Sequence, residues 1–166
     1  MNENYMEYMV RKKVSPLFQW GSYLCIFFAI VFFLLGIMGD PILFVLFILF
    51  AVAAYILKTR EIIEFEYLYL EKEIIIDKVI GLRKRKRVAE IKMENVDLFA
   101  PMYSDKAKDA SVYATGKALD YSTGNQLTRE NCFLIITGNR QKYILEPSIE
   151  FVKMAQMVAP RKVFIQ

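Results

Sequence analysis

Two long apolar segments near the N-terminus dominate the pattern of hydrophobic and polar positions. Residues 20–38 and 41–57 contain no charged side chain, and only Gly39 and Asp40 separate them. Each segment approaches the roughly 20 apolar residues that a helix needs to cross a bilayer. Phenylalanines lie on every helical face, whereas a helix in a soluble core would normally keep a polar face. The pattern predicts a transmembrane helical hairpin, and a hairpin buried in a soluble bundle is the alternative. The predicted hairpin covers residues 16–58, with spans at about 17–38 and 41–58.

The residues that flank the hairpin predict its ends and its orientation. Ser15 before Pro16, and Asp40 before Pro41, are typical of a helix N-cap followed by a first helical position. Basic residues lie on the outer side of both spans, while the connecting turn contains only Asp40. Under the positive-inside rule, this asymmetry predicts a two-span protein of the cell membrane with both termini in the cytoplasm. The basic flanking residues are Arg11, Lys12 and Lys13 before the first span, and Lys58 and Arg60 after the second.

Residues 1–15 form a cytoplasmic N-terminal segment with two open interpretations. Tyr5, Met6, Met9 and Val10 lie close to helical spacing. A short amphipathic helix on the inner leaflet would place Arg11, Lys12 and Lys13 near anionic headgroups. A disordered segment is the alternative.

Residues 59–166 change from continuous apolar sequence to the alternation of β-strands, which predicts a cytoplasmic domain. A two-residue hairpin turn is expected at Gly138 and Asn139, and Ser148 is placed to cap a final helix before Pro160. The polar segment 102–131 is expected to be a mobile loop or irregular hairpin, with short strands at 111–115 and 117–121. The other expected strands are 61–70, 74–80, 82–91, 95–100, 132–137 and 140–146.

Six or seven antiparallel strands closed by one helix is the element order of a pleckstrin-homology-like (PH-like) domain. The chain resembles small bacterial membrane proteins in which two spans precede a bacterial PH-like domain, and particularly an uncharacterised family among them. This resemblance implies an α+β membrane protein, in which an N-terminal transmembrane hairpin precedes an antiparallel PH-like domain that a C-terminal helix closes. It implies no activity, because PH-like folds bind lipids, peptides and proteins. The residues that carry it are Tyr67–Ile80, Arg83–Arg87 and Phe99–Pro101.

Composition narrows the classes of function. The chain has a net charge of +4, which does not suggest nucleic acid as a partner. It has no histidine, which removes His-based zinc sites and imidazole catalysis, and we found no nucleophile or phosphate motif. Cys25 and Cys132 are expected to be free thiols. The sequence therefore predicts a protein that is not an enzyme and has no cofactor, metal or catalytic residue.

The basic run Arg83–Arg87 is the clearest candidate site. On a strand, Arg83, Arg85 and Arg87 would face one way and Lys84 and Lys86 the other. One interpretation is contact with anionic headgroups, at roughly 1 kcal/mol per basic residue near the surface. The other is a structural edge strand that is protected by its charges or paired with acidic residues. The residues considered for lipid contact are Arg83, Lys84, Arg85, Lys86 and Arg87, together with Arg11, Lys12 and Lys13.

Acidic and aromatic residues complete the candidates. Glu64 and Glu66 could form a catalytic pair, but alternation along a strand explains them as a solvated face. Phe65, Tyr67 and Tyr69 are expected in the core. Possible partner contacts in the polar segment are Tyr103, Tyr113 and Tyr121.

The favoured function is that of a non-enzymatic, membrane-anchored PH-like module at the cytoplasmic face, which binds a protein partner or anionic lipid headgroups. The alternative is an accessory subunit of a larger membrane transport or secretion complex, in which the hairpin itself packs against other subunits. In both cases the expected partners are the bilayer, anionic lipids and an unidentified protein, and not nucleic acid.

Overall fold

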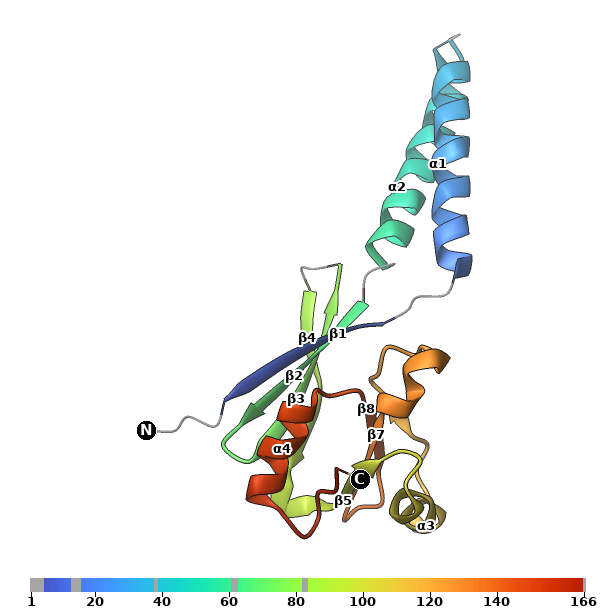
Figure 1. Cartoon of the computed structure of the whole chain (residues 1–166). Helices are drawn as coiled ribbons and strands as arrows, with labels where there is room; N and C mark the ends of the chain where they lie inside the picture. Colours follow the sequence, from blue (N-terminus) through green and yellow to red (C-terminus); the bar gives the residue numbers. More distant parts are fainter. Residues whose placement is uncertain (1–4, 13–15, 38, 61–62, 82–83, 166) are drawn as a thin grey trace. The chain divides into compact units, whose positions relative to one another are not determined.

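The computed structural model describes residues 5–12, 16–37, 39–60, 63–81 and 84–165 (Figure 1). The chain divides into two compact units. One contains residues 14–63 and 80–83, and the other contains residues 1–13, 64–79 and 84–166. The second unit therefore takes in the N-terminus, which differs from the expected domain boundary at residue 59.

The first unit contains the two apolar helices, α1 (Pro16–Gly36) and α2 (Pro41–Arg60). Both are long and apolar enough to cross a membrane. In the 18-residue apolar stretch of each helix, only 11% of α1 and 6% of α2 is buried. The Asp40 side chain accepts a hydrogen bond from the Ile42 N–H, as expected for the cap of α2. A Cβ on Gly36 would lie 3.0 Å from the Phe44 ring, so a glycine here lets the two helices approach closely. The expected cap Ser15 lies outside the described residues.

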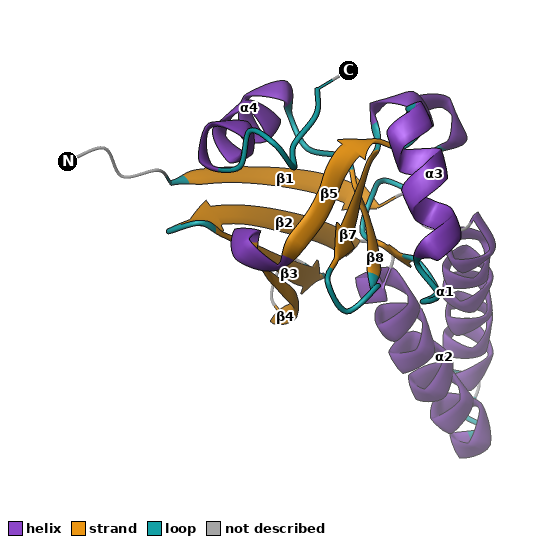
Figure 2. Ribbon diagram, turned by 90° about the horizontal axis from the view of Figure 1, so that it is seen from below, coloured by secondary structure: helices purple, strands orange, loops and turns teal. Residues whose placement is uncertain are grey.

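A four-stranded sheet in the order β1-β2-β3-β4 forms one half of the second unit (Figure 2). Arg11 contacts Glu64 and Tyr8 contacts Tyr67, so β1 and β2 run in opposite directions. We call the end of this sheet where β1 finishes, and where β2 and β4 begin, the linker end. The opposite end, at the Glu71–Lys72 turn, is the turn end. The strands are β1 (Met6–Lys12), β2 (Ile63–Leu70), β3 (Glu73–Ile80) and β4 (Lys84–Lys92).

Strand β1 corrects both interpretations of the N-terminal segment. Its residues alternate between the sheet's inner face and solvent, with Val10 buried and Met9 half exposed. The helix-like spacing of the apolar residues was misleading, because pairing with β2 satisfies the backbone of β1 and buries Tyr8 against Tyr67. The α1–α2 hairpin is therefore inserted between two neighbouring strands of one sheet.

A second sheet, in the order β5-β7-β8-β6, and helix α4 complete this unit. Strands β5, β7 and β8 are antiparallel, and the short β6 joins β8 in parallel. Phe151 on α4 packs against Tyr67 and Tyr69, which are both fully buried as expected. Ser148 caps α4 by accepting a hydrogen bond from the Phe151 N–H. The elements are β5 (Val96–Pro101), β6 (Leu119–Asp120), β7 (Phe133–Thr137), β8 (Lys142–Leu145) and α4 (Ile149–Val158).

The segment 102–131 contains more regular structure than expected. Helix α3 (Asp105–Tyr113) begins at Ser104, whose hydroxyl accepts a hydrogen bond from the Ala107 N–H. Ala107 and Ala110 pack against the outer face of the second sheet. The expected strand at 111–115 is therefore wrong, because capping and apolar burial favour a helix here. A 3-10 helix, η2 (Gln126–Asn131), precedes β7.

The hairpin between β7 and β8 is present as expected, but its turn is longer than two residues. The Thr137 N–H donates to the Gln141 carbonyl, and Arg140 adopts a positive φ of 62°. The turn thus also includes Arg140, which matches a three-residue loop with its last residue in the left-handed region.

Candidate functional site

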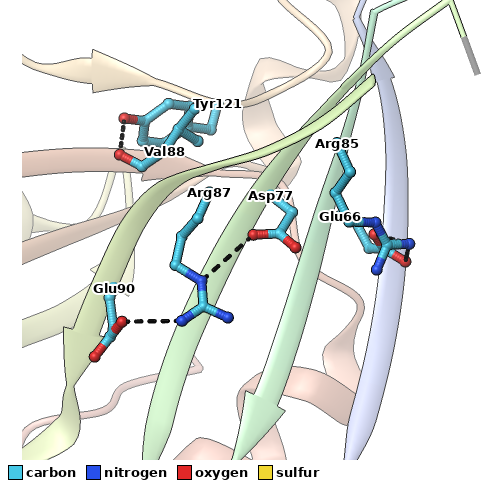
Figure 3. A network of polar contacts seen from close by, with 7 residues as sticks. All are labelled: Glu66, Asp77, Arg85, Arg87, Val88, Glu90 and Tyr121. Carbon is cyan, nitrogen blue, oxygen red and sulfur yellow. Dashed lines mark hydrogen bonds and ion pairs between the residues drawn. The ribbon is translucent and has the colours of Figure 1, made fainter. Parts of the chain in front are cut away.

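Strand β4 is an edge strand of the first sheet, and its two arginines are paired with buried carboxylates. Arg85 Nη2 lies 2.6 Å from Glu66 Oε2, and Arg87 Nε lies 3.7 Å from Asp77 Oδ1 (Figure 3). Arg87 also contacts Glu90 at 3.2 Å on its own strand. These contacts support the structural interpretation for Arg85 and Arg87, because each guanidinium is already held by a carboxylate.

The carboxylates themselves correct the expectation of a solvated acidic face. Glu64, Glu66 and Asp77 are 8%, 1% and 6% exposed. Strands β2 and β3 lie between β1 and β4, so long arginine side chains from these two outer strands extend over the sheet and cover the acidic groups. Arg11 Nε lies 3.0 Å from Glu64 Oε1 on one side of β2, and Arg85 Nη2 lies 2.9 Å from Glu66 Oε1 on the other.

Glu66 holds its proton unusually tightly for a carboxyl group. Burial, a hydrogen bond with Glu7 and the charges of Glu7 and Asp77 together raise its pKa to about 7, while the charge of Arg85 opposes the shift. The same hydrogen bond, together with one from the Tyr5 hydroxyl, lowers the pKa of Glu7. Glu7 and Glu66 thus share a hydrogen bond between β1 and β2, and the opposite shifts of their pKa values place the proton on Glu66.

Two lysines of β4 differ from its arginines. Lys84 and Lys86 are exposed, and neither forms an ion pair with another residue in the described part of the chain. Lys12 lies over the Phe65 ring at 5.7 Å, and Arg11 is bound to Glu64. Among the described candidates for lipid contact, the arginines are thus paired with carboxylates, whereas Lys84 and Lys86 are exposed and form no ion pair with a described residue. Arg83 and Lys13 lie outside the described residues.

Tyr121 links the two sheets, whereas the sequence analysis considered it as a partner contact. Its ring packs on Phe65 at 5.3 Å between centroids, and its hydroxyl donates to the Val88 carbonyl at 3.4 Å (Figure 3). Its carbonyl accepts from the Tyr67 hydroxyl. Of the three tyrosines considered as partner contacts, only Tyr103 and Tyr113 are exposed.

Acidic residues line two cavities of the second unit. One cavity of about 390 Å³ is lined by residues that include Glu90, Lys92 and Tyr143, and another of about 420 Å³ by residues that include Glu130 and Glu146. Over the described ranges, no three Cys, Asp or Glu side chains are grouped to hold a metal ion.

Sequence patterns alone could have located part of this site. The alternation of Arg85 and Arg87 predicted their common face, and Asp77 stands out because it follows the apolar run Ile74–Ile76. The pairing of Arg11 with Glu64 had no sequence signal, since the two residues are 53 positions apart and the entire hairpin lies between them.

Comparison with known proteins agrees with the expected fold. A family model described as "Bacterial PH-like domain (DUF6106)" matches residues 2–165. No curated protein and no solved structure matches the chain. The match extends over β1, both apolar helices and α4, so the hairpin is part of the family pattern rather than an addition to it.

Proposed function

Because the chain belongs to the family of bacterial PH-like domains, we propose that it is a non-enzymatic interaction module that is anchored in the cell membrane and contacts anionic lipid headgroups. The α1–α2 hairpin is the anchor. Lys84 and Lys86 are the lipid contacts, and the paired arginines hold the strand that carries them. One observation carries the proposal: Lys84 and Lys86 are exposed at the start of β4, whereas Arg85 and Arg87 are bound to carboxylates.

The character of the helices supports the anchor. Their apolar side chains are largely exposed, which water would penalise and lipid would not. Lys58 near the end of α2 lies over the Tyr23 ring at 4.9 Å, an arrangement typical of the membrane interface. The basic flanks and the acidic turn favour both termini in the cytoplasm.

The connections between the two units support a contact at the linker end. Three residues join Lys12 to Pro16, and two join Arg60 to Ile63. An extended chain covers at most about 3.5 Å per residue, so such short connections keep the last residue of β1 and the first residue of β2 close to the proposed anchor. Lys84 begins β4 at this same end. Each lysine near an anionic surface would then contribute roughly 1 kcal/mol.

The test uses the full chain, reconstituted in vesicles that contain phosphatidylcholine and phosphatidylglycerol. Electron paramagnetic resonance of spin-labelled lipids measures the preference of the protein for each headgroup. We expect wild type to prefer phosphatidylglycerol, and Lys84→Gln/Lys86→Gln to reduce this preference by a factor of about two to five. The preference is expected to fall with added salt.

A matched control removes two positive charges elsewhere on the same unit. Lys72 lies at the turn end and Lys153 on α4, and both are exposed. Lys72→Gln/Lys153→Gln is expected to leave the lipid preference unchanged. A wild-type protein without headgroup preference would overturn lipid contact and leave a protein partner as the ligand.

A groove on the hairpin favours accessory-subunit function as the second candidate. It has a volume of about 360 Å³ and is lined by residues that include Ala29, Ala51 and Ala54. Small side chains allow close approach of a further transmembrane helix. Under this proposal, Ala51→Leu would release the chain from a larger complex in native membranes, as measured by gel filtration after mild solubilisation.

A further inference from the structure

We propose that η2 makes a second, apolar contact with the membrane through Leu127. This inference rests on the proposed function, because it requires the linker end of the first sheet to lie near the bilayer. Its ligand is the boundary between headgroups and acyl chains, and not the charge of the headgroups.

The exposure of Leu127 is the first observation. At 88%, it is the most exposed large hydrophobic side chain among the described residues. A single exposed leucine is common on soluble proteins, so exposure alone does not define a contact. The position of Leu127 in the fold is the second observation that supports a membrane contact.

That position follows from a series of contacts that starts at the linker end. Lys12, the last residue of β1, lies over the Phe65 ring, and Tyr121 packs on the same ring. The chain that leaves Tyr121 leads directly into η2. The Thr123 and Thr128 hydroxyls lie 3.1 Å apart, which holds η2 against this segment.

The turn that carries Leu127 is held by side-chain hydrogen bonds rather than by burial of the leucine. The Thr123 hydroxyl donates to Glu146 Oε2 at 2.6 Å, and Asn125 Oδ1 accepts from the Leu127 N–H at 3.3 Å. None of the residues that form η2 is buried. The fold thus fixes the backbone of η2 and leaves its apolar side chain in solvent.

The charges around Leu127 favour an apolar contact over an electrostatic one. Arg129 and Glu130 follow it in η2, and their formal charges cancel. A contact made here should therefore form on neutral lipid and resist salt, whereas contacts of Lys84 and Lys86 should need anionic lipid.

The experiment uses the full chain in phosphatidylcholine vesicles and the quenching of tryptophan fluorescence by brominated phosphatidylcholine. Trp20 is the only tryptophan of the chain and reports insertion of α1. In a Trp20→Phe background, Leu127→Trp reports the proposed contact. Met157→Trp is the matched control, since Met157 is 81% exposed and lies on α4, whose C-terminal end lines a cavity with Lys72 at the turn end.

We expect Leu127→Trp to be quenched to at least about half the extent of Trp20, without dependence on salt, and Met157→Trp to be unquenched. The control also measures the affinity of an exposed indole for lipid. Equal quenching of Leu127→Trp and Met157→Trp, with Trp20 strongly quenched, would overturn this inference and leave the anchor in place. Absence of Trp20 quenching would overturn the anchor, and this inference with it.

Discussion

Arg85 covers Glu66 on the first sheet: its Nη2 atom lies 2.6 Å from Oε2 and 2.9 Å from Oε1 of a carboxyl group that is 1% exposed. Arg85 itself remains 57% exposed, so the pair lies at the boundary between sheet and solvent. The contact crosses from β4 to β2, over β3. The contact therefore connects the edge strand that carries Lys84 and Lys86 to β2, which follows the apolar hairpin in the sequence.

Removal of this arginine should loosen the edge strand. Arg85→Gln leaves Glu66 buried without its cation, which costs several kcal/mol in a dry interior but less here because Arg85 is partly solvated. We expect the free energy of unfolding to fall by about 1–2 kcal/mol. Thermal unfolding of the full chain in detergent, followed by near-ultraviolet circular dichroism, measures the change.

Lys86→Gln is the control for that measurement, because it removes one positive charge from the same strand and breaks no ion pair with a described residue. It should change stability by no more than about 0.5 kcal/mol. Equal effects of Arg85→Gln and Lys86→Gln would show that strand charge, and not the pair with Glu66, stabilises β4.

The raised pKa of Glu66, about 7 against an ordinary value of 4.5, makes stability depend on pH. The folded protein binds the proton more tightly than the unfolded chain. Its stabilising contribution is therefore complete below about pH 4.5 and is lost as the pH rises through 7. The lowered pKa of Glu7 acts in the opposite direction, but at pH values below its ordinary range. Arg85, Asp77 and Tyr5 are the other groups that act on this pair.

We expect wild type to lose about 1–3 kcal/mol of unfolding free energy between pH 5 and pH 8. Glu66→Gln mimics the protonated acid and should flatten this dependence, while Glu71→Gln, at an exposed turn position, should not. The same thermal unfolding experiment, repeated across the pH range, measures both. A wild-type protein that becomes more stable from pH 5 to pH 8 would contradict the assignment.

The main elements of the fold could be predicted because each carries a local signal. The length and continuous apolar character of α1 and α2, the alternation in β2, and the cap at Ser148 are all readable from neighbouring residues. Strand β1 was missed because its partner lies beyond the hairpin, and nothing in seven residues specifies a pairing across that distance. Helix α3 was missed because it is polar, with small alanines as its only buried contacts.

The candidate site was predictable only in part for the same reason. The basic run was evident, but the partners that divide it into paired arginines and exposed lysines come from other strands. Alternation places Glu64 and Glu66 on one face, yet it does not reveal that arginines from β1 and β4 cover that face.

Tyr67 should act as a polar connection between the two sheets. Its hydroxyl donates to the Tyr121 carbonyl at 2.5 Å and accepts from the Glu146 N–H at 3.3 Å. Tyr67→Phe leaves both backbone groups without this partner, so we expect a loss of about 1–3 kcal/mol in unfolding free energy. Tyr113→Phe, at a 76% exposed position, is the matched control and should have almost no effect. Equal stability of the two variants would contradict the connection.

The placement of β1 predicts which parts of the chain fold as a soluble domain. A fragment of residues 58–166 lacks β1, so it exposes one edge of β2 and removes the contacts of Tyr8 with Tyr67 and of Arg11 with Glu64. We expect this fragment to aggregate or to unfold at low denaturant, because an unpaired strand edge and uncovered aromatic surface favour association.

Replacement of the hairpin by a short Gly/Ser linker should restore the domain, because β1 ends beside the start of β2. In the linked protein, the Gly/Ser linker joins residue 12 to residue 63, so that it contains residues 1–12 and 63–166. Both proteins are expressed without membrane, and chemical denaturation compares their stability. The linked protein should be monomeric and more stable by several kcal/mol, as expected when a strand with buried side chains is restored. If the 58–166 fragment were equally stable, β1 would contribute nothing to the sheet, and the hairpin would precede the domain rather than interrupt it.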